Sequence, residues 1–441
     1  MKVFSFLAAL IISITSFAND TGIVINIKFN GSKDNIRMEV GKESMIVKPD
    51  ESGNARVLLD IKFPQYVKLH RSTRPELLFL FPGDQLDVSI TGAAIGRLEF
   101  SGKHAAINKY LSDPNSVQAG GGFNLDEAEY LDFMRNKVKN AVERLEKMGF
   151  EKEFTEMEKK RIASKVYTSL VTYPNLRKRT ERTYHPSDNY FSFVKEVLFE
   201  DAGMLLLNEY TDFIQYLYQM LGTKDIRVYD AFNYAESTLK YVVNHVKDEQ
   251  VKKHLVNFYA YDYLKRHGIE KAEPITAIFR KHVDNASQIK LYDETIKKWQ
   301  NVTPGKVMTD FTFYDIDGKA VPISAFRGKY VYIDVWATWC VPCIAEIPNL
   351  KKLEEELTGK NITFISISVD KDAEAWKKML IEDKFTGVQL HARGREFSNE
   401  LLIVSIPRFI LLDPEGRIIE ANATRPGRPE TLEKMKSLPG I

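Results

Sequence analysis

Cysteine is almost absent from this chain: its 441 residues contain only Cys340 and Cys343. A framework of several disulfides, common in small exported domains, is therefore excluded. A tetrahedral zinc site needs four ligands and no second cysteine pair exists, which argues against zinc. Covalent haem attachment needs a histidine directly after the second cysteine, where Ile344 stands. The cores must stabilise the domains, and the cysteine pair is available for chemistry.

The chain has no large excess of either charge: it contains 62 Lys and Arg and 60 Asp and Glu, which gives a formal net charge of +2. The composition therefore favours neither nucleic acid nor an anionic membrane as a partner. A long apolar run occurs only near the start, from Val3 to about Ile14, after Lys2 and before Ser16-Phe17-Ala18. We interpret residues 1–18 as a secretory signal peptide, because the run is short for a span of about 20 residues. The mature chain is then expected to be soluble and exported; an uncleaved membrane anchor is the alternative.

The length suggests two or three domains. Residues 19–104 contain short runs of alternating apolar residues separated by turn signals, which predict a small antiparallel β-sandwich. Residues 105–300 place apolar residues three and four apart, which predicts a helical region. Residues 304–441 alternate predicted strands and helices, and their near-continuous apolar strands indicate a mostly parallel sheet covered by helices.

Both cysteines lie in "WATWCVPC", between the predicted buried strand "KYVYIDVWA" and a helix predicted from Cys340 to about Leu357. A thiol reacts as its thiolate, and the free N–H groups and dipole of a helix start favour that charge. Cys340 is therefore predicted to be the exposed, attacking cysteine. Cys343, one turn further in, is placed to attack a mixed disulfide formed at Cys340. Pro342 suits the first helical turn, because it has no N–H to leave unsatisfied.

The segments "YIDVWATWCVPCIAEIPNL" and "VSIPRFILLDPEGRII" resemble the thioredoxin superfamily, most closely its TlpA/ResA-like periplasmic branch. The resemblance covers about residues 304–441. It implies a thioredoxin-like α/β domain whose redox group is the Cys340–Cys343 disulfide, with no other cofactor and no metal. It also implies that Pro407 is cis and faces the cysteines, and that the Ile406 backbone pairs with a substrate chain. The side chains and backbone implied to bind substrate are those of Trp339, Val341, Pro342, Ile406 and Pro407. Arg408 departs from the family, which commonly has Thr there, so the substrate preference stays open.

Two carboxylates near the motif are candidates for proton transfer. Asp334 lies in the otherwise apolar strand before the cysteines, where burial raises a carboxyl pKa and suits it to act as a base. The resemblance implies that Asp334 moves protons to and from Cys343, and that Glu346, one turn after it, tunes the cysteines. A structural, hydrogen-bonded Asp334 and a helix-stabilising Glu346 remain the alternatives.

Together these features predict an enzyme, a periplasmic thiol–disulfide oxidoreductase that reduces the disulfides of client proteins. A membrane electron donor is expected to re-reduce it, because the compartment is oxidising. One alternative is a thiol peroxidase, since "DFTFYDIDGKAVPISAFRGK" is shared with peroxiredoxins. Another is a redox-sensing binding protein whose region before residue 304 docks a partner. No nucleic acid partner is expected, and the oligomeric state is left open.

Overall fold

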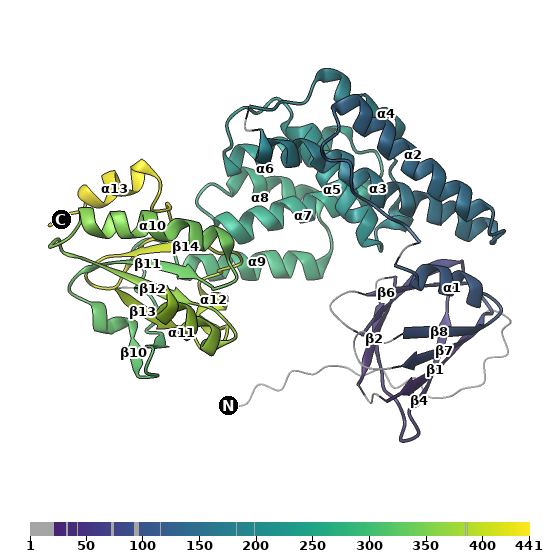
Figure 1. Cartoon of the computed structure of the whole chain (residues 1–441), viewed down its shortest axis with the longest axis horizontal. Coiled ribbons are helices and arrows are strands. Elements are labelled where there is room, and N and C mark those ends of the chain that lie inside the picture. Colours follow the sequence, from purple (N-terminus) through teal and green to yellow (C-terminus); the bar gives the residue numbers. More distant parts are fainter. Residues whose placement is uncertain are drawn as a thin grey trace. The chain divides into compact units, whose positions relative to one another are not determined.

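The computed structural model describes residues 22–441 except 32–33, 42, 72–74, 92–96, 115, 182, 198, 384 and 386. The predicted signal peptide, residues 1–18, therefore lies outside the described residues. The chain divides into two compact units between Met220 and Leu221, inside the stretch predicted to be helical. Figure 1 shows the elements of both units. Within the described part of the chain, no helix combines the length and apolarity that a membrane crossing requires.

The first unit begins with two four-stranded sheets, ordered β4-β1-β7-β8 and β3-β2-β5-β6. The strands are β1 (Gly22–Asn30), β2 (Ile36–Val40), β3 (Glu43–Val47), β4 (Asn54–Asp60), β5 (Gln65–His70), β6 (Glu76–Leu80), β7 (Gln85–Thr91) and β8 (Arg97–Gly102). The predicted alternation is confirmed in β1, where Ile23, Ile25 and Ile27 are buried in the core that the two sheets share. The prediction of purely antiparallel pairing is wrong, because β1 runs parallel to β7. Of the strands between β1 and β7, all but β4 belong to the second sheet. The chain therefore passes through the second sheet before β7 joins β1, and β7 runs in the same direction as β1.

Helices complete the first unit. They are α1 (Ala105–Ser112), α2 (Glu127–Glu146), α3 (Lys152–Thr180), α4 (Val194–Val197) and α5 (Asn208–Thr223). Helix α3 is joined to the sandwich by buried charge: Tyr66 of β5 donates to Glu158 Oε2 at 2.6 Å, and Arg161 Nε donates to the same oxygen at 2.7 Å. The ion pair lies within α3, and the hydrogen bond from Tyr66 to its buried carboxylate connects the helix to the sheet.

The second unit opens with the helices α6 (Ala231–His245), α7 (Glu249–His267), α8 (Glu273–His282) and α9 (Ala286–Asn301). Helix α7 ends at Gly268, which has φ of 83° and lies against the indole of Trp299 on α9. A Cβ added at Gly268 would come within 3.3 Å of that ring, and its backbone conformation also favours glycine. The end of α7 and the end of α9 therefore meet closely.

A seven-stranded sheet ordered β10-β9-β13-β12-β11-β14-β15 forms the rest of the unit. Its strands are β9 (Thr312–Tyr314), β10 (Ala320–Pro322), β11 (Tyr330–Trp336), β12 (Ile362–Ser368), β13 (Val388–His391), β14 (Arg408–Leu412) and β15 (Ile418–Ala423). Its helices are α10 (Val341–Glu356), α11 (Ala373–Glu382), α12 (Glu396–Glu400) and α13 (Pro429–Lys436). Strand β11 is buried throughout, parallel to β12 and antiparallel to β14. The predicted thioredoxin-like α/β domain is confirmed, with α10 and α13 on one face of the sheet (Figure 1).

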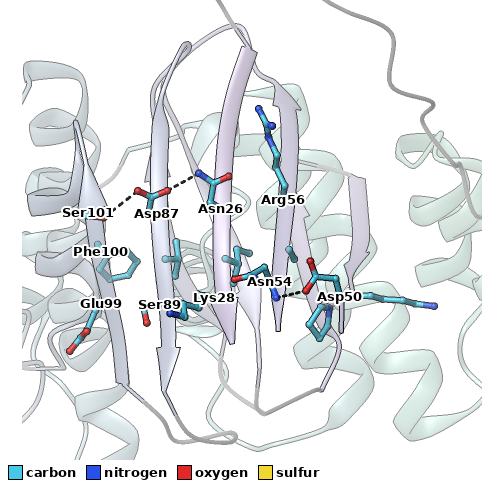
Figure 2. A pocket seen from close by; sticks show the side chains of 15 residues that line it. Asn26, Lys28, Asp50, Asn54, Arg56, Asp87, Ser89, Glu99, Phe100 and Ser101 are labelled. Atoms are coloured by element: carbon cyan, nitrogen blue, oxygen red, sulfur yellow. Dashed lines mark hydrogen bonds between the residues drawn. The ribbon is translucent and has the colours of Figure 1, made fainter. Parts of the chain in front are cut away.

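A polar groove of about 850 Å³ crosses the outer face of the first sheet, β4-β1-β7-β8 (Figure 2). Positive side chains such as Lys28 and Arg56 alternate there with negative ones such as Asp87, which accepts a hydrogen bond from Asn26 at 2.7 Å. This mixture of charges selects no class of ligand. The groove belongs to the first unit, whereas both cysteines belong to the second.

Candidate redox site

Strand β11 carries the chain directly to the cysteines. After Trp336 the chain turns, and the N–H of Cys340 donates to the carbonyl of Ala337 at 3.0 Å. Cys340 is the N-cap of α10 and is disulfide-bonded to Cys343. The N–H of Cys343 also donates to Sγ of Cys340 at 3.3 Å. The predicted helix start is confirmed, and it supplies one backbone donor that a thiolate at Cys340 would use.

The disulfide lies in an apolar setting. Cys340 and Cys343 form a buried cluster with Trp336, Ala337, Trp376 and Leu380. The prediction that Cys340 is exposed is wrong for this disulfide form, in which only 3% of the residue is accessible, because its sulfur is bonded to Cys343 and covered by the cluster. The exposed apolar side chains are its neighbours, Trp339 at 68% and Val341 at 74%. Trp336 packs in the core and stacks on Phe385.

Asp334 lies buried on the face of β11 that α10 covers. Residues two apart on a strand share a face, and Tyr332 packs in the same cluster as Leu350 and Leu353 of α10. Burial raises the pKa of Asp334 to about 7, and the charge of Glu346 adds to the increase. A carboxyl that titrates near neutral pH can both accept and return a proton there. Asp334 therefore has the protonation behaviour that proton transfer at the site requires.

The carboxylate of Glu346 contacts the chain segment that follows β15. Its Oε2 accepts hydrogen bonds from Asn349 Nδ2 at 3.1 Å and from the N–H of Gly427 at 3.3 Å. Its Oε1 lies 3.8 Å from Nη1 of Arg425. Gly427 lies close to this cluster: a Cβ added there would lie 2.7 Å from Asn349 Nδ2, so the Asn349 side chain would have to move. Neither Arg425 nor Gly427 carries a sequence signal that links it to Glu346, 79 or more residues earlier.

The loop before β14 brings Ile406 to the cysteine cluster, against which it is partly buried. The Ile406–Pro407 peptide bond is cis. Arg408, the next residue, is only 6% exposed and lies on the face of the sheet opposite to Asp334. Its guanidinium lies 5.6 Å from the ring of Trp299. Burial lowers its pKa to about 10. Arg408 thus connects the helix α9 to the strand that follows the cis-proline.

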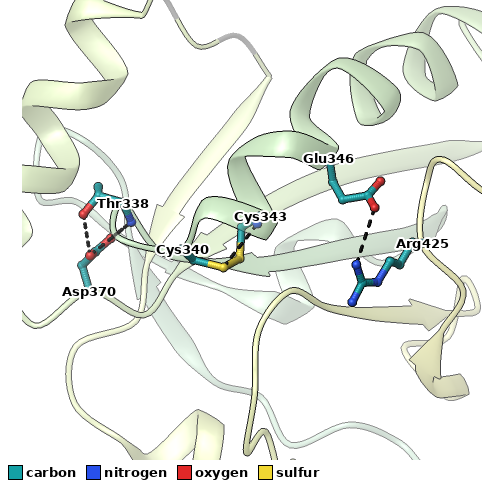
Figure 3. Close-up of a disulfide and its surroundings, with 6 residues drawn as sticks. All are labelled: Thr338, Cys340, Cys343, Glu346, Asp370 and Arg425. Atoms are coloured by element: carbon teal, nitrogen blue, oxygen red, sulfur yellow. Dashed lines mark hydrogen bonds and ion pairs between the residues drawn. A yellow bond between two sulfur atoms is a disulfide. The ribbon is translucent and has the colours of Figure 1, made fainter. Parts of the chain in front are cut away.

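Sequence reasoning missed a buried hydrogen-bond cluster at the other end of the motif. Thr338, between the two tryptophans, donates its N–H to Asp370 Oδ2 at 3.0 Å and its hydroxyl to Oδ1 at 2.8 Å. Figure 3 shows this pair and the Glu346–Arg425 pair on opposite sides of the disulfide. Asp370 is the last residue of "NITFISISVD", which the sequence predicts as a buried strand, and an acid at the end of such a strand is the available signal.

The C-terminal part of the chain is similar in sequence to known proteins. Residues 303–437 match the Redoxin family model. Over 130 residues the chain is 26% identical to the thiol-disulfide oxidoreductase ResA of Bacillus cereus, covering 30% of this chain and 75% of that protein. A thiol-disulfide oxidoreductase from Bacteroides fragilis is 30% identical, with 30% of this chain and 98% of that chain covered and a TM-score of 0.27. A candidate thiol-disulfide oxidoreductase from Bacteroides vulgatus is 53% identical, with 29% and 84% covered and a TM-score of 0.28. The C-terminal domain belongs to the TlpA/ResA-like thioredoxin superfamily.

The TlpA/ResA-like domain makes the protein a thiol–disulfide oxidoreductase, and its cysteines are the pair at the start of α10. The remainder of the chain, residues 22–302, lies outside the matched segment.

We expect Cys340 to be alkylated faster than Cys343 in the reduced protein. Cys340 is the N-cap and receives the Cys343 N–H, so its thiolate is the better stabilised of the two. Iodoacetamide labelling followed by peptide mass spectrometry measures both rates in one sample, and the Cys340→Ser and Cys343→Ser proteins serve as single-site references. Faster labelling at Cys343 would reverse the assigned roles.

Proposed function

We propose that this protein is an exported reductase of protein disulfides that works in the periplasm. The observation that carries the proposal is the Cys340–Cys343 disulfide at the first turn of α10, the helix that covers the strand face on which Asp334 is buried. The pairing of two cysteines supports dithiol exchange over a peroxidase that uses one peroxidatic cysteine. The dipeptide Val341-Pro342 between the cysteines lacks the histidine usual in strong oxidants, which supports the reducing direction.

The reaction begins with the reduced protein. The Cys340 thiolate attacks one sulfur of a client disulfide; a new S–S bond joins Cys340 to the client, and the other client sulfur leaves as a thiolate and is protonated. Asp334 then accepts the proton of Cys343, whose thiolate attacks Sγ of Cys340. The second client sulfur leaves as a thiolate and is protonated as Asp334 gives up the proton it accepted. The Cys340–Cys343 disulfide has then formed, and the client has gained two electrons and two protons.

Client binding is assigned to the apolar surface around the disulfide. Trp339 and Val341 are exposed and flank Cys340, and Pro342 lies between the cysteines. Across from them, the Ile406–Pro407 loop offers backbone groups that an extended client segment could pair with. Because the periplasm is oxidising, the disulfide must be re-reduced by a dithiol donor, which we place in the membrane. Residues 22–302 are proposed to dock the client or the donor.

The reduction potential tests the proposed direction of electron flow. We expect a midpoint below about −180 mV, the value of protein disulfide isomerase, and toward the ~−270 mV of thioredoxin. The protein is equilibrated in mixtures of reduced and oxidised glutathione or dithiothreitol, and the dithiol fraction is counted by mass spectrometry after alkylation. A midpoint near −120 mV, typical of a strong oxidant, would contradict the reductase and leave the oxidoreductase chemistry intact.

A further inference from the structure

The Asp370 carboxylate is buried next to the redox motif and has no cationic partner among the described residues. Asp370 is 5% exposed. It accepts the Thr338 N–H and hydroxyl, and the Ser368 hydroxyl at 2.8 Å. In each of these hydrogen bonds the carboxylate is the acceptor, which fits an ionised carboxylate because it has no proton to donate. A charge in this place is costly unless its hydrogen bonds are complete.

The charged and titratable groups around Asp370 do not neutralise it. His391 donates Nε2–H to the backbone oxygen of Asp370 at 3.0 Å, and burial lowers the pKa of His391, so the ring is neutral at pH 7. Lys377 pairs with Glu374 at 3.0 Å, and Arg393 lies 3.6 Å from the ring of Tyr314. Lys371 and Asp372, which follow in the chain, are both exposed and opposite in charge.

The carboxylate is bound to the same turn that carries the attacking cysteine. Cys340 N–H closes the turn on Ala337, and Asp370 takes the N–H of Thr338 within it. The Thr338 N–H is 3.0 Å from the carboxylate, and two residues of chain span at most about 7 Å, so the Cys340 backbone lies within about 10 Å of this negative charge. Both residues are buried, where charges are poorly screened. A nearby negative charge disfavours a thiolate, and a dithiol whose thiolate is disfavoured gives up its electrons more readily.

We propose that Asp370 is a positioning residue that holds the turn before Cys340 and, through its charge, disfavours the Cys340 thiolate, which makes the dithiol a stronger reductant. The inference rests on the proposed reductase function and supplies a structural source for its reducing direction. No step of the exchange passes through Asp370; its charge acts on the reduced form of the cysteine pair.

Asp370→Asn is the decisive variant, because an amide removes the charge and can keep most of the contacts. Its Oδ1 can still accept the hydroxyl of Thr338 and, at the 3.2 Å seen in the wild type, the N–H of Thr338, although the shorter N–H contact to Oδ2 is lost. Its Nδ2 can donate to the Ser368 hydroxyl, which already accepts the Asp370 N–H. We expect Cys340 of the reduced variant to react with iodoacetamide about 3- to 10-fold faster at a pH below its titration midpoint, and equally fast well above it. Measured above the titration midpoint, where the thiolate is the populated reduced form, the equilibrium constant against glutathione should shift by a similar factor in the oxidising direction.

The controls separate charge from packing. Asp372→Asn removes an equal charge from an exposed position two residues on, and should leave both readouts within twofold of the wild type. Thr338→Val keeps the carboxylate and removes one hydrogen bond, and should not accelerate alkylation. If Asp370→Asn melts early, Asp370→Ser provides a second charge-free side chain. Alkylation that is unchanged or slower in a folded charge-free variant overturns the inference. This readout needs no client, so it is decided separately from the reductase proposal.

Discussion

Replacing either cysteine is expected to remove all catalysed reduction of insulin by dithiothreitol, leaving only the rate of dithiothreitol alone. Both sulfurs take part in the exchange: without Cys340 nothing attacks the client, and without Cys343 nothing resolves the mixed disulfide. The turbidity of precipitating insulin chains measures the rate. Cys340→Ser and Cys343→Ser are compared with the wild type and with Glu374→Gln, an exposed change on α11.

The melting temperature of each cysteine variant is the control for correct folding in this first test. The disulfide closes a very short loop, so its loss should change the melting temperature little. Wild-type activity in both cysteine variants would show that the motif is not the redox centre. Activity retained by Cys343→Ser alone would favour a mechanism with one cysteine, as in the peroxidase alternative, which hydrogen peroxide consumption then tests directly.

Asp334→Asn is expected to slow resolution of the mixed disulfide at pH 7 by about 10²-fold, within the range usual for a general base. Wild-type resolution should accelerate as the pH rises through about 7, where the pKa of Asp334 lies, because the ionised form is the base. The Asn variant should lose that inflection, while alkylation of Cys340 stays unchanged. Stopped-flow decay of a preformed mixed disulfide across pH gives the profile.

Glu346→Gln should produce a smaller and distinct change. Its charge helps to raise the pKa of Asp334, so its removal moves the inflection of the resolution rate to lower pH without abolishing it. Profiles identical to the wild type in both variants would leave the two carboxylates with structural roles. A slower Asn variant that kept the inflection would assign the base to another group.

Stability gives Asp334 an independent signature. Burial raises its pKa from the ordinary 3.8 of an aspartate to about 7, so the folded state holds the proton more tightly than the unfolded chain. The free energy of unfolding gains this contribution at low pH and loses it as the pH rises from about 4 to 7. Asp334→Asn should therefore be more stable than the wild type at pH 8, by roughly 2–4 kcal/mol, while it is less active.

Much of the redox domain follows from local pattern. Strand β11 reads as a continuous apolar run, the cysteines stand at the helix start, and Asp334 is the one acid in the strand. The spacing of apolar residues and the residues at a helix start are local features, so each can be recognised within a single segment of the sequence. The same holds for β1, whose alternating Ile residues predicted one buried face.

The rest depends on register between distant segments. Asp370 reaches Thr338 because β11 and β12 pair in parallel with Trp336 opposite Ser368, a register that the sequence does not reveal for residues 32 positions apart. The contact of Arg425 and Gly427 with Glu346 depends on how the segment after β15 crosses α10. The parallel pairing of β1 with β7 likewise follows from the path of the strands between them. The burial of Cys340 depends on Trp376 and Leu380 from α11.

Trapping the exchange intermediate tests the central claim most directly. The reduced Cys343→Ala and Cys340→Ala proteins are each mixed with a peptide disulfide, quenched with acid, and mapped by mass spectrometry. We expect a long-lived mixed disulfide on Cys340 of Cys343→Ala, formed much faster than any adduct on Cys343 of Cys340→Ala. Equal or faster adduct formation on Cys343 would contradict it.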